Sequence, residues 1–595
     1  MGFFRRTKPV ATFLGALGAL CVFGAIRSVH SQPKIAAAVA SSACPNDDSG
    51  LKLPAGFCAT VFADGVGHAR HMVAAPDGVL YVNTWSGRYY GNDTPHAGGF
   101  LVALQDKNGA GKADVIERFG ETVQSGGHGG TGIGMYKGSV FAESNDRIVR
   151  YALTDGSIVP SGAPETIVSG LPLGGDHPMH PFIISDEGTM YVDVASATNA
   201  CQAKNRTLHS PGLDPCTELE TRGGVWHYDA NKTDQTFSPA ERYATGIRNA
   251  EGFAFEGGQL FATQHGRDQL HTNWPEVYRP DQEATLPAEE VLLLKQGGDY
   301  GWPECYYDSF VRKLVLAPEY GGNGKKIGVC AEKTAPAASF PAHWAPNAMA
   351  HYDKEQFPAR YGDGLFIAFH GSWNRAPYPQ GGYNVVFQLM AGDHASGRCE
   401  VFADGFAGAV KSPEKAEHRP SGLAVGPDGA LYVSDDIRGR IYRITYRGGP
   451  FDESSVTACP SETAPAGEVV AEPGKPPEGT HPNAGAAANA KVVVPEGATR
   501  EMVALGQRIY RGQVGGAACT GCHGESGRGS TLGPPLNGKK WLWSDGSYAG
   551  ITKSIVDGVS QPKEYRSPMP AKGGAQLTDE QVKALAAYVW SLSHR

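Results

Sequence analysis

The segment Cys519-Thr-Gly-Cys522-His523 has the most specific chemistry in the sequence. Two thiols three positions apart can add to the two vinyl groups of one haem, and the adjacent histidine can bind the iron. A redox-active cysteine pair and half of a zinc site are alternative interpretations. A zinc site needs a second ligand pair, and residues 495–595 contain no further cysteine. The motif therefore predicts a covalently attached haem c with His523 as an iron ligand.

A second iron ligand is expected beyond this motif. Met569 lies in a Pro-flanked loop before the last predicted helix, whereas Met502 fits a helix core and His594 lies at the chain end. Helical spacing over residues 499–511, and Thr578 with Gln581 as a capping box, predict a small all-α domain at 495–595. This order of helix, haem motif, Met loop and helix resembles class I cytochromes c. The resemblance implies Met569 as the axial ligand.

Other reactive side chains are concentrated in loops of the first 450 residues. Histidine, arginine and amide groups that converge on one mouth could bind a planar polyanion. An isolated histidine or Arg-Asn pair in a loop is more often a solvated turn or a strand cap, so grouping is what matters. The candidates, in chain order, are His128, Asp176, His177, Arg248, Asn249, Gln264, His265, Gly266, Trp373, Arg375 and Arg419.

The elements that must position these residues repeat along the chain. A turn containing Gly, followed by alternating apolar and aromatic residues, predicts a hairpin that enters a half-buried strand. Six repeats predict an all-β six-bladed propeller at 44–450, with a β-sandwich as the competing fold. The six occurrences begin at Asp77, Lys137, Glu187, Gly257, Gly362 and Asp428.

The loop phrases together resemble the soluble pyrroloquinoline quinone (PQQ) dehydrogenases of the glucose and sorbosone dehydrogenase family. The resemblance covers roughly residues 50–448. It rests on Asp176-His177 before a strand, Gly246-Ile-Arg248-Asn249, Asp299-Tyr-Gly-Trp-Pro303, His370-Gly-Ser-Trp-Asn-Arg375, and Arg419-Pro with the sixth repeat. It implies that PQQ binds at the propeller mouth.

The same resemblance implies roles for individual residues. His177 is expected to take the substrate hydroxyl proton, with Asp176 orienting it. Further residues are expected to contact PQQ or line the substrate side: Arg248, Asn249, Arg419, Arg375, Gln264, His128 and Trp373. A Ca²⁺ ion that polarises the quinone is expected on backbone oxygens of His265 and Gly266.

The sequence thus predicts a PQQ-dependent dehydrogenase of a sugar, sugar alcohol or aldehyde. Its electrons are expected to pass through the haem to an external acceptor such as a cytochrome, a quinone or another redox protein. A lactonase-type propeller hydrolase with an accessory haem is an alternative that would need a ring of acidic calcium ligands. The third hypothesis is a non-catalytic propeller joined to an electron-transfer cytochrome.

Composition and cysteine content predict an exported protein. The 595-residue chain has a formal net charge of −8, which does not favour nucleic-acid binding. Residues 1–31 read as a signal peptide, for which an uncleaved anchor is the alternative, and no later stretch could cross a bilayer. Residues 453–494, rich in Pro, Ala and Gly, predict a linker.

Eight cysteines remain outside the signal and the haem motif, an even number that suggests disulfides in a periplasmic or secreted protein. The sequence does not fix their connectivity. Pairing neighbours gives Cys44–Cys58, Cys201–Cys216, Cys305–Cys330 and Cys399–Cys459, and free buried thiols are the alternative.

Overall fold

The computed structural model describes most of the chain. The described residues are 2, 44, 47–84, 97–121, 130–154, 156–375, 378–413, 415–448, 451–462, 493–511, 514, 517, 519–524, 527–529, 533–565, 569–575 and 577–594. The expected signal peptide, apart from Gly2, and most of the expected linker lie outside them. None of the helices in these ranges combines the length and apolar character needed to cross a bilayer.

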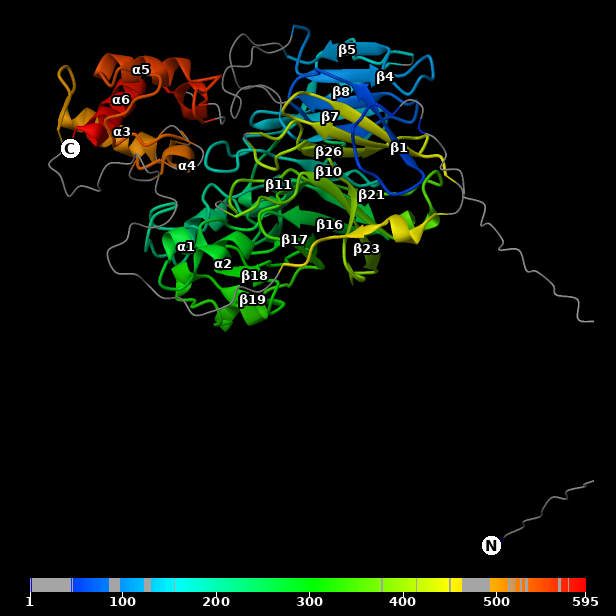
Figure 1. Cartoon of the computed structure of the whole chain (residues 1–595). Helices are drawn as coiled ribbons and strands as arrows, with labels where there is room; N and C mark the ends of the chain where they lie inside the picture. Colours follow the sequence, from blue (N-terminus) through cyan, green and yellow to red (C-terminus); the bar gives the residue numbers. More distant parts are fainter. Residues whose placement is uncertain are drawn as a thin grey trace, which may run out of the picture. The chain divides into compact units, whose positions relative to one another are not determined.

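Six multi-stranded sheets form the blades of a propeller (Figure 1). Blade 1 contains β2 (Ala69–Ala74), β3 (Leu80–Thr84), β4 (Leu101–Gln105) and β5 (Val115–Phe119). Blade 2 contains β6 (Ile133–Tyr136), β7 (Ser139–Ser144), β8 (Arg147–Ala152), β9 (Glu165–Ser169) and the parallel edge strand β13 (Gln235–Thr236). Blade 3 contains β10 (Phe182–Ile184), β11 (Thr189–Val194), β12 (Gly224–Asp229) and β14 (Arg242–Thr245).

The second half of the ring follows the same plan. Blade 4 contains β15 (Phe253–Glu256), β16 (Gln259–Gln264), β17 (Glu289–Leu293) and β20 (Ala338–Phe340). Blade 5 contains β21 (Pro346–His351), β22 (Gly364–Phe369), β23 (Asn384–Ala391), β24 (His394–Ala395), β25 (Glu400–Ala403) and β29 (Thr457–Ala458). Blade 6 contains β26 (Pro420–Val425), β27 (Leu431–Asp435), β28 (Ile441–Tyr446) and β1 (Phe57–Ala63).

The first strands of successive blades contact one another all the way round, from β2 to β26 and back to β2. The ring is closed in blade 6, where β1 pairs antiparallel with β28 and Phe57 lies opposite Tyr446. Each repeated sequence phrase forms the second strand of a blade or the turn that enters it. The prediction of a six-bladed propeller is confirmed.

Local turn chemistry explains why the repeats form hairpins. Lys137 and Gly138, between β6 and β7, have φ angles of 47° and 70°, and Gly257 and Gly258, between β15 and β16, have 56° and 77°. Two consecutive positive φ angles give the turn whose twist matches that of the flanking strands, and glycine adopts them without strain. The glycines of the repeated phrase therefore set the register of these two hairpins.

Apolar side chains of neighbouring blades pack against each other. Between blades 1 and 2, Tyr81 and Leu101 meet Val140 and Val149, and all four are buried. Burying a side chain of this size contributes about 1.5–3 kcal/mol, so the inter-blade layers hold the ring together.

An excursion from blade 4 forms a separate small cluster. It contains α1 (Leu270–Asn273), α2 (Pro280–Thr285), β18 (Cys305–Asp308) and β19 (Lys313–Leu316), which lie together in Figure 1. Short 3-10 helices complete the chain: η1 (Thr217–Glu220), η2 (Pro239–Glu241), η3 (Pro318–Tyr320), η4 (Gly328–Glu332), η5 (Ala359–Gly362), η6 (Glu453–Ser455) and η7 (Ala571–Gly574).

All four expected disulfides are present: Cys44–Cys58, Cys201–Cys216, Cys305–Cys330 and Cys399–Cys459. The last of them corrects the linker boundary. Residues 453–462, expected in the linker, belong to the propeller, because β29 pairs with β25 and Cys459 is bonded to Cys399. Their composition resembles a linker, but strand pairing and a disulfide hold them.

The C-terminal region is helical, as expected. Its helices are α3 (Arg500–Tyr510), α4 (Cys519–His523), α5 (Tyr548–Asp557) and α6 (Asp579–Ser593). The predicted capping box of Thr578 and Gln581 begins α6. Helix α3 crosses α6 at Gly506, where a Cβ atom would lie 1.9 Å from the carbonyl oxygen of Ala584. Glycine is therefore needed for this close approach.

Candidate functional site

The candidate catalytic side chains lie on segments that flank the first and second strands of blades 3 and 4. His177 precedes β10 and Arg248 precedes β15, whereas Ser196 follows β11 and Gly266 follows β16. Because the two strands of a hairpin are antiparallel, the start of the first and the end of the second lie at the same end of the blade. The topology therefore brings these segments together.

The imidazole of His177 is held at one nitrogen. Its Nδ1 lies 2.9 Å from the carbonyl oxygen and 3.0 Å from Oγ of Ser196. A carbonyl oxygen only accepts hydrogen bonds, so Nδ1 carries the proton of the neutral ring and Nε2 keeps a lone pair. Burial, followed by the positive charge of Arg248, holds the pKa of His177 well below its usual value. The ring is therefore neutral at pH 7 and can accept a proton at Nε2.

Asp176 has a different partner from the one expected. We expected it to orient His177, but its carboxylate forms an ion pair with Arg206 at 2.9 Å, and Ser196 supplies the contacts at Nδ1. The backbone N–H of Asp176 donates to the carbonyl of Ala197 at 2.8 Å. Asp176 thus anchors the loop that carries His177, and the orienting contact comes from Ser196.

Arg248 is buried and uses its whole guanidinium. Nε and Nη2 donate to the backbone oxygen and Oδ1 of Asn199, each at 3.1 Å, and Nη1 donates to the carbonyl of Gly266 at 3.0 Å. Nη2 also forms an ion pair with Asp268 at 3.0 Å. These contacts fix the orientation of the guanidinium in a loop region where it would otherwise be mobile.

Asp268 links several of these residues. It forms ion pairs with Arg248 and Arg206, both at 3.0 Å, and accepts a hydrogen bond from Asn374 at 2.7 Å. Burial raises the pKa of its carboxyl group, but the charges of Arg248 and Arg206 outweigh this and leave the pKa below its usual value. Asp268 is therefore charged, and sequence reasoning gave it no role.

Two further expected contacts lie beside Arg248. Oε1 of Gln264 accepts a hydrogen bond from the backbone N–H of Arg248 at 2.9 Å. Asn249 is buried, its Nδ2 lies 3.4 Å from Glu251, and its Oδ1 has no hydrogen-bond partner among the described residues. A buried polar atom without a partner is costly, so Asn249 has capacity for a ligand.

Arg419 lies on the sixth blade. It is buried, and its Nε and Nη2 donate to the carbonyl oxygens of His370 and Gly371 at 3.0 and 2.5 Å. The guanidinium lies 5.7 Å from the ring centroid of Tyr383. No carboxylate in the described part of the chain forms an ion pair with it. A buried cation with neutral partners is suited to binding an anionic ligand.

A charged network that sequence reasoning missed connects blades 1, 4, 5 and 6. Arg70 on β2 forms ion pairs with Glu251 at 2.7 Å and with Asp436 at 2.8 Å. Asp436 also contacts Nε2 of His370 at 2.9 Å. The available signal was an arginine within the otherwise apolar-rich strand β2, because a buried charge needs a partner. This network ties the inner strands together.

The C-terminal region presents the expected haem-attachment motif on α4. Cys519 and Cys522 form no disulfide, whereas the eight other described cysteines are all in disulfides. Nδ1 of His523 lies 2.9 Å from the carbonyl oxygen of Pro534. That oxygen requires the proton on Nδ1, so Nε2 is left to bind a metal. These residues fit a covalently bound haem.

Met569, the expected second iron ligand, is held by its backbone. Its N–H donates to the carbonyl of Val559 at 2.9 Å, and its carbonyl accepts from the N–H of Val559 at 2.7 Å. The side chain is half-buried against the hydrophobic core of the helices. Its role as an iron ligand stays a prediction.

Comparison with known proteins decides the family. The TrAA12-like family model matches residues 51–447, and a Cytochrome c family model matches residues 503–593. The chain belongs to the TrAA12-like family. The TrAA12-like propeller is thus followed in the same chain by a cytochrome c domain, as the sequence predicted.

Curated relatives match part of the TrAA12-like chain. An uncharacterized protein of Borreliella burgdorferi is 27% identical over 214 residues, covering 35% of this chain and 49% of that protein. A PQQ-dependent pyranose dehydrogenase of Coprinopsis cinerea is 27% identical over 235 residues, covering 34% of this chain and 31% of that protein. The chain therefore spans about half the length of the first relative and about a third of the second.

Solved structures share the TrAA12-like fold. The iodide structure of the Trichoderma reesei family AA12 protein has a TM-score of 0.54 at 17% identity, and covers 67% of this chain and 98% of that one. The holo form of the pyranose dehydrogenase PQQ domain of Coprinopsis cinerea has a TM-score of 0.51 at 19% identity, with the same coverage. At these identities the likeness establishes the propeller fold.

The three other expected site residues of the TrAA12-like propeller are Arg375, Trp373 and His128. Arg375 pairs with Glu462 and donates to the carbonyl of Ala342 at 3.1 Å, so its charge is already balanced. Trp373 is half-buried in the same loop, beside Asn374. His128 lies outside the described residues. The expected contacts of Arg375, Trp373 and His128 with PQQ or the substrate stay predictions.

The expected calcium site does not fit the arrangement of the TrAA12-like propeller. The Gly266 carbonyl, an expected ligand, accepts a hydrogen bond from the cationic Arg248. A guanidinium at a ligand oxygen repels a second cation. Within the described ranges, no group of three or more His, Cys, Asp or Glu residues is arranged to hold a metal ion. We therefore derive no step through calcium.

Proposed function

We propose that this protein is a PQQ-dependent dehydrogenase that oxidises a sugar, a sugar alcohol or an aldehyde. Its electrons leave through its own haem c to an external acceptor. The observation that carries the proposal is the convergence of a neutral histidine and a fixed arginine at one end of a propeller, in a chain that also has a C-x-x-C-H motif whose cysteines form no disulfide. The pyranose dehydrogenase relative supports a sugar substrate.

The charges and polar atoms of the propeller fit a polyanionic quinone. Arg419 has a buried positive charge whose hydrogen bonds in the described region go to carbonyl oxygens, and Asn249 has a buried oxygen without a partner there. Arg248 is oriented by Asn199 and Asp268. In this proposal Arg248, Asn249 and Arg419 hold PQQ, and Gln264 fixes the backbone beneath Arg248.

His177 acts as the general base. When bound, PQQ supplies the acceptor for the hydride that leaves the substrate carbon. His177 takes the hydroxyl proton at Nε2, because Ser196 keeps the ring proton on Nδ1. The low pKa of His177, caused first by burial and then by Arg248, keeps Nε2 unprotonated at pH 7.

The cytochrome c domain passes the electrons onward. Bound haem supplies a one-electron centre, and a thioether ligand favours its reduced state. Cys519 and Cys522 attach the haem, His523 binds the iron through Nε2, and Met569 is the proposed second ligand. Residues 463–492 of the linker join the two domains and keep their local concentration high.

We also propose that the protein works in the periplasm or outside the cell. Four disulfides support this proposal, because disulfides persist mainly in oxidising compartments. The proposed signal peptide at residues 1–31 accounts for export.

Reconstitution tests the proposed function. Purified haem-loaded protein is mixed with PQQ and then with a panel of aldoses, sugar alcohols and aldehydes while the reduced haem absorbance is recorded. Haem reduction that requires both PQQ and a substrate is expected. Lactone hydrolysis without PQQ would favour the hydrolase alternative, and no reaction of either kind would favour the non-catalytic propeller. A parallel series in EDTA shows whether quinone binding needs Ca²⁺ despite the Arg248 contact at Gly266.

A further inference from the structure

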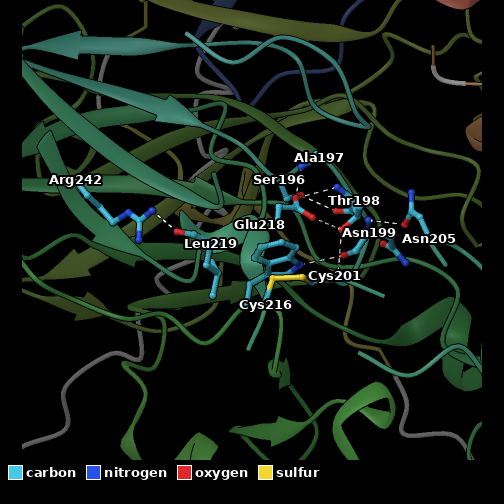
Figure 2. Close-up of a disulfide and its surroundings, with 11 residues drawn as sticks. Ser196, Ala197, Thr198, Asn199, Cys201, Asn205, Cys216, Glu218, Leu219 and Arg242 are labelled. Atoms are coloured by element: carbon cyan, nitrogen blue, oxygen red, sulfur yellow. Dashed lines mark hydrogen bonds between the residues drawn. A yellow bond between two sulfur atoms is a disulfide. The ribbon is translucent and has the colours of Figure 1, made fainter. Parts of the chain in front are cut away.

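One short segment contacts both sides of the candidate site. The segment Ala195–Asn199 follows β11, and Figure 2 shows most of it beside a disulfide. On one side, the carbonyl and Oγ of Ser196 hold Nδ1 of His177. On the other side, the N–H of Ser196 donates to the carbonyl of Arg248 at 2.8 Å, and Asn199 binds the guanidinium of Arg248 twice. The position of this segment therefore determines how the side chains of His177 and Arg248 are oriented.

Glu218 fixes the middle of the segment. Its Oε1 accepts hydrogen bonds from the N–H groups of Ala197 and of Thr198, the second at 3.0 Å. Its Oε2 accepts from Oγ1 of Thr198 at 2.6 Å. One carboxylate thus satisfies two backbone donors and a hydroxyl, which is an arrangement that immobilises a loop.

The disulfide Cys201–Cys216 positions Glu218 relative to the segment. Cys216 lies two residues before Glu218, on the N-terminal side of η1, and Cys201 lies two residues after Asn199. The N–H of Cys201 donates to Oγ1 of Thr198 at 2.9 Å, and the N–H of Asn199 donates to Oδ1 of Asn205 at 3.0 Å. Figure 2 shows the disulfide, Glu218 and the segment in one group.

We propose that Glu218, fixed by the Cys201–Cys216 disulfide, is a positioning residue for the proposed quinone site. It touches neither substrate nor cofactor. It acts by holding Ser196 and Asn199, which orient His177 and Arg248. This inference rests on the proposed function for its effect on turnover, whereas its effect on the segment itself is independent of that function.

The first test compares variants at Glu218. Glu218→Ala removes the three contacts, and Glu218→Gln keeps a side-chain oxygen that can accept from both N–H groups. Glu220→Ala, an exposed acid on the same 3-10 helix, is the matched control. For each protein we would measure hydrogen exchange over residues 195–206 without quinone, PQQ affinity by equilibrium titration, and kcat and KM for haem reduction.

Glu218→Ala is expected to increase exchange in the segment at least tenfold and to weaken PQQ binding at least tenfold. It is also expected to lower kcat by more than it raises KM, because His177 and Arg248 lose their alignment. Glu218→Gln should stay within about threefold of the parent protein in all measurements, because it preserves the main contacts. If Glu218→Ala fails to fold, Thr198→Val is compared instead; it removes the hydroxyl contacts with Glu218 and with the N–H of Cys201.

The second test removes the disulfide. The pair Cys201→Ser and Cys216→Ser is compared with Cys44→Ser and Cys58→Ser, because the two disulfides close loops of nearly equal length, with sequence separations of 15 and 14. Similar losses of thermal stability are expected from the two double variants. Only the first is expected to increase exchange over residues 195–206 and to weaken PQQ binding at least tenfold.

The outcomes distinguish a wrong proposed function from a wrong positioning role for Glu218. If the parent protein neither binds PQQ nor reduces its haem, the proposed function is wrong, and the exchange data still decide whether Glu218 orders the segment. If the parent protein is active but Glu218→Ala or Thr198→Val behaves like Glu220→Ala in exchange and in PQQ affinity, the positioning role is overturned.

Discussion

At the scale of single residues, the tautomer of His177 decides which atom can act. Ser196 offers a carbonyl oxygen to Nδ1, so the lone pair lies on Nε2. A histidine with a low pKa is a weaker base, but all of it is in the reactive form at pH 7. A role for His177 in proton abstraction can therefore be separated from a role in binding.

Replacing His177 tests that separation. His177→Ala is expected to lower substrate-driven haem reduction by about 10²–10⁴-fold, the usual contribution of a general base. PQQ affinity should change little, because Arg248, Asn249 and Arg419 remain. His394→Ala, at an exposed histidine in blade 5, is the control. Normal turnover by His177→Ala would remove it from the mechanism.

The pH dependence of kcat/KM is a second prediction. The base must be unprotonated, so activity falls as pH drops through the pKa of His177. Burial, then the charges of Arg248, Arg206 and His265, keep that pKa well below 6.5. We expect kcat/KM to stay level from pH 7 through pH 6.5 and to decline only in more acidic buffer. A midpoint at pH 6.5 or higher would contradict the buried, neutral histidine.

Replacing Met569 tests whether it is the second iron ligand of the haem. Met569→Ala is expected to leave the haem covalently attached, because Cys519 and Cys522 are unchanged, and to lower its midpoint potential, because a thioether ligand is lost. Met502→Ala, in the core-facing part of α3, is the control. The measurement is a spectroscopic redox titration. An unchanged potential in Met569→Ala would mean that another residue is the second ligand.

At the scale of elements, helix propensity and the α3–α6 contact predict opposite effects of Gly506→Ala on the free energy of unfolding. Helix propensity alone predicts that Gly506→Ala stabilises by about 1 kcal/mol. Because the new Cβ would lie 1.9 Å from the carbonyl oxygen of Ala584, we expect the free energy of unfolding to fall by about 1–3 kcal/mol instead.

The measurement for Gly506→Ala is unfolding of the haem domain in urea. Ala504→Gly, at an exposed position on the same helix, serves as the control and should cost about 1 kcal/mol from propensity alone. A stabilised Gly506→Ala variant would show that the helices can move apart without cost.

Local patterns were sufficient to predict the elements but only part of the site. The repeated Gly-containing turns identified the second strand of each blade, and Thr578 with Gln581 identified the start of α6, because both signals lie within a few residues. Glu218 and Asp268 were not identified as site residues. Their partners, Thr198 and Arg248, are about 20 residues away in sequence, and only the folded chain brings them together.

The linker was predicted to begin too early for a similar reason, because the contacts that order residues 453–462 are distant in sequence. Composition describes whether a segment can bury apolar surface, and residues 453–462 bury little. Their order comes from pairing of β29 with β25 and from the bond between Cys459 and Cys399. The cysteine pairing was predicted separately, but composition alone placed the boundary too early.

At the scale of the whole molecule, the disulfides should differ in what they contribute. Cys399–Cys459 has a sequence separation of 60 and Cys44–Cys58 one of 14. In the loop-entropy view, replacing each pair by serine costs about 4 and about 3 kcal/mol respectively. Urea unfolding of the propeller measures both losses. A larger loss for Cys44→Ser with Cys58→Ser would contradict this order.

The closure of the ring also bears on how the protein is made. Blade 6 takes β1 from the start of the propeller and β28 from its end. A growing polypeptide can complete the first five inner strands, but β1 has no hydrogen-bonding edge to join until Tyr446 has been synthesised. Biogenesis must therefore keep an apolar edge protected from aggregation for nearly the whole of propeller translation.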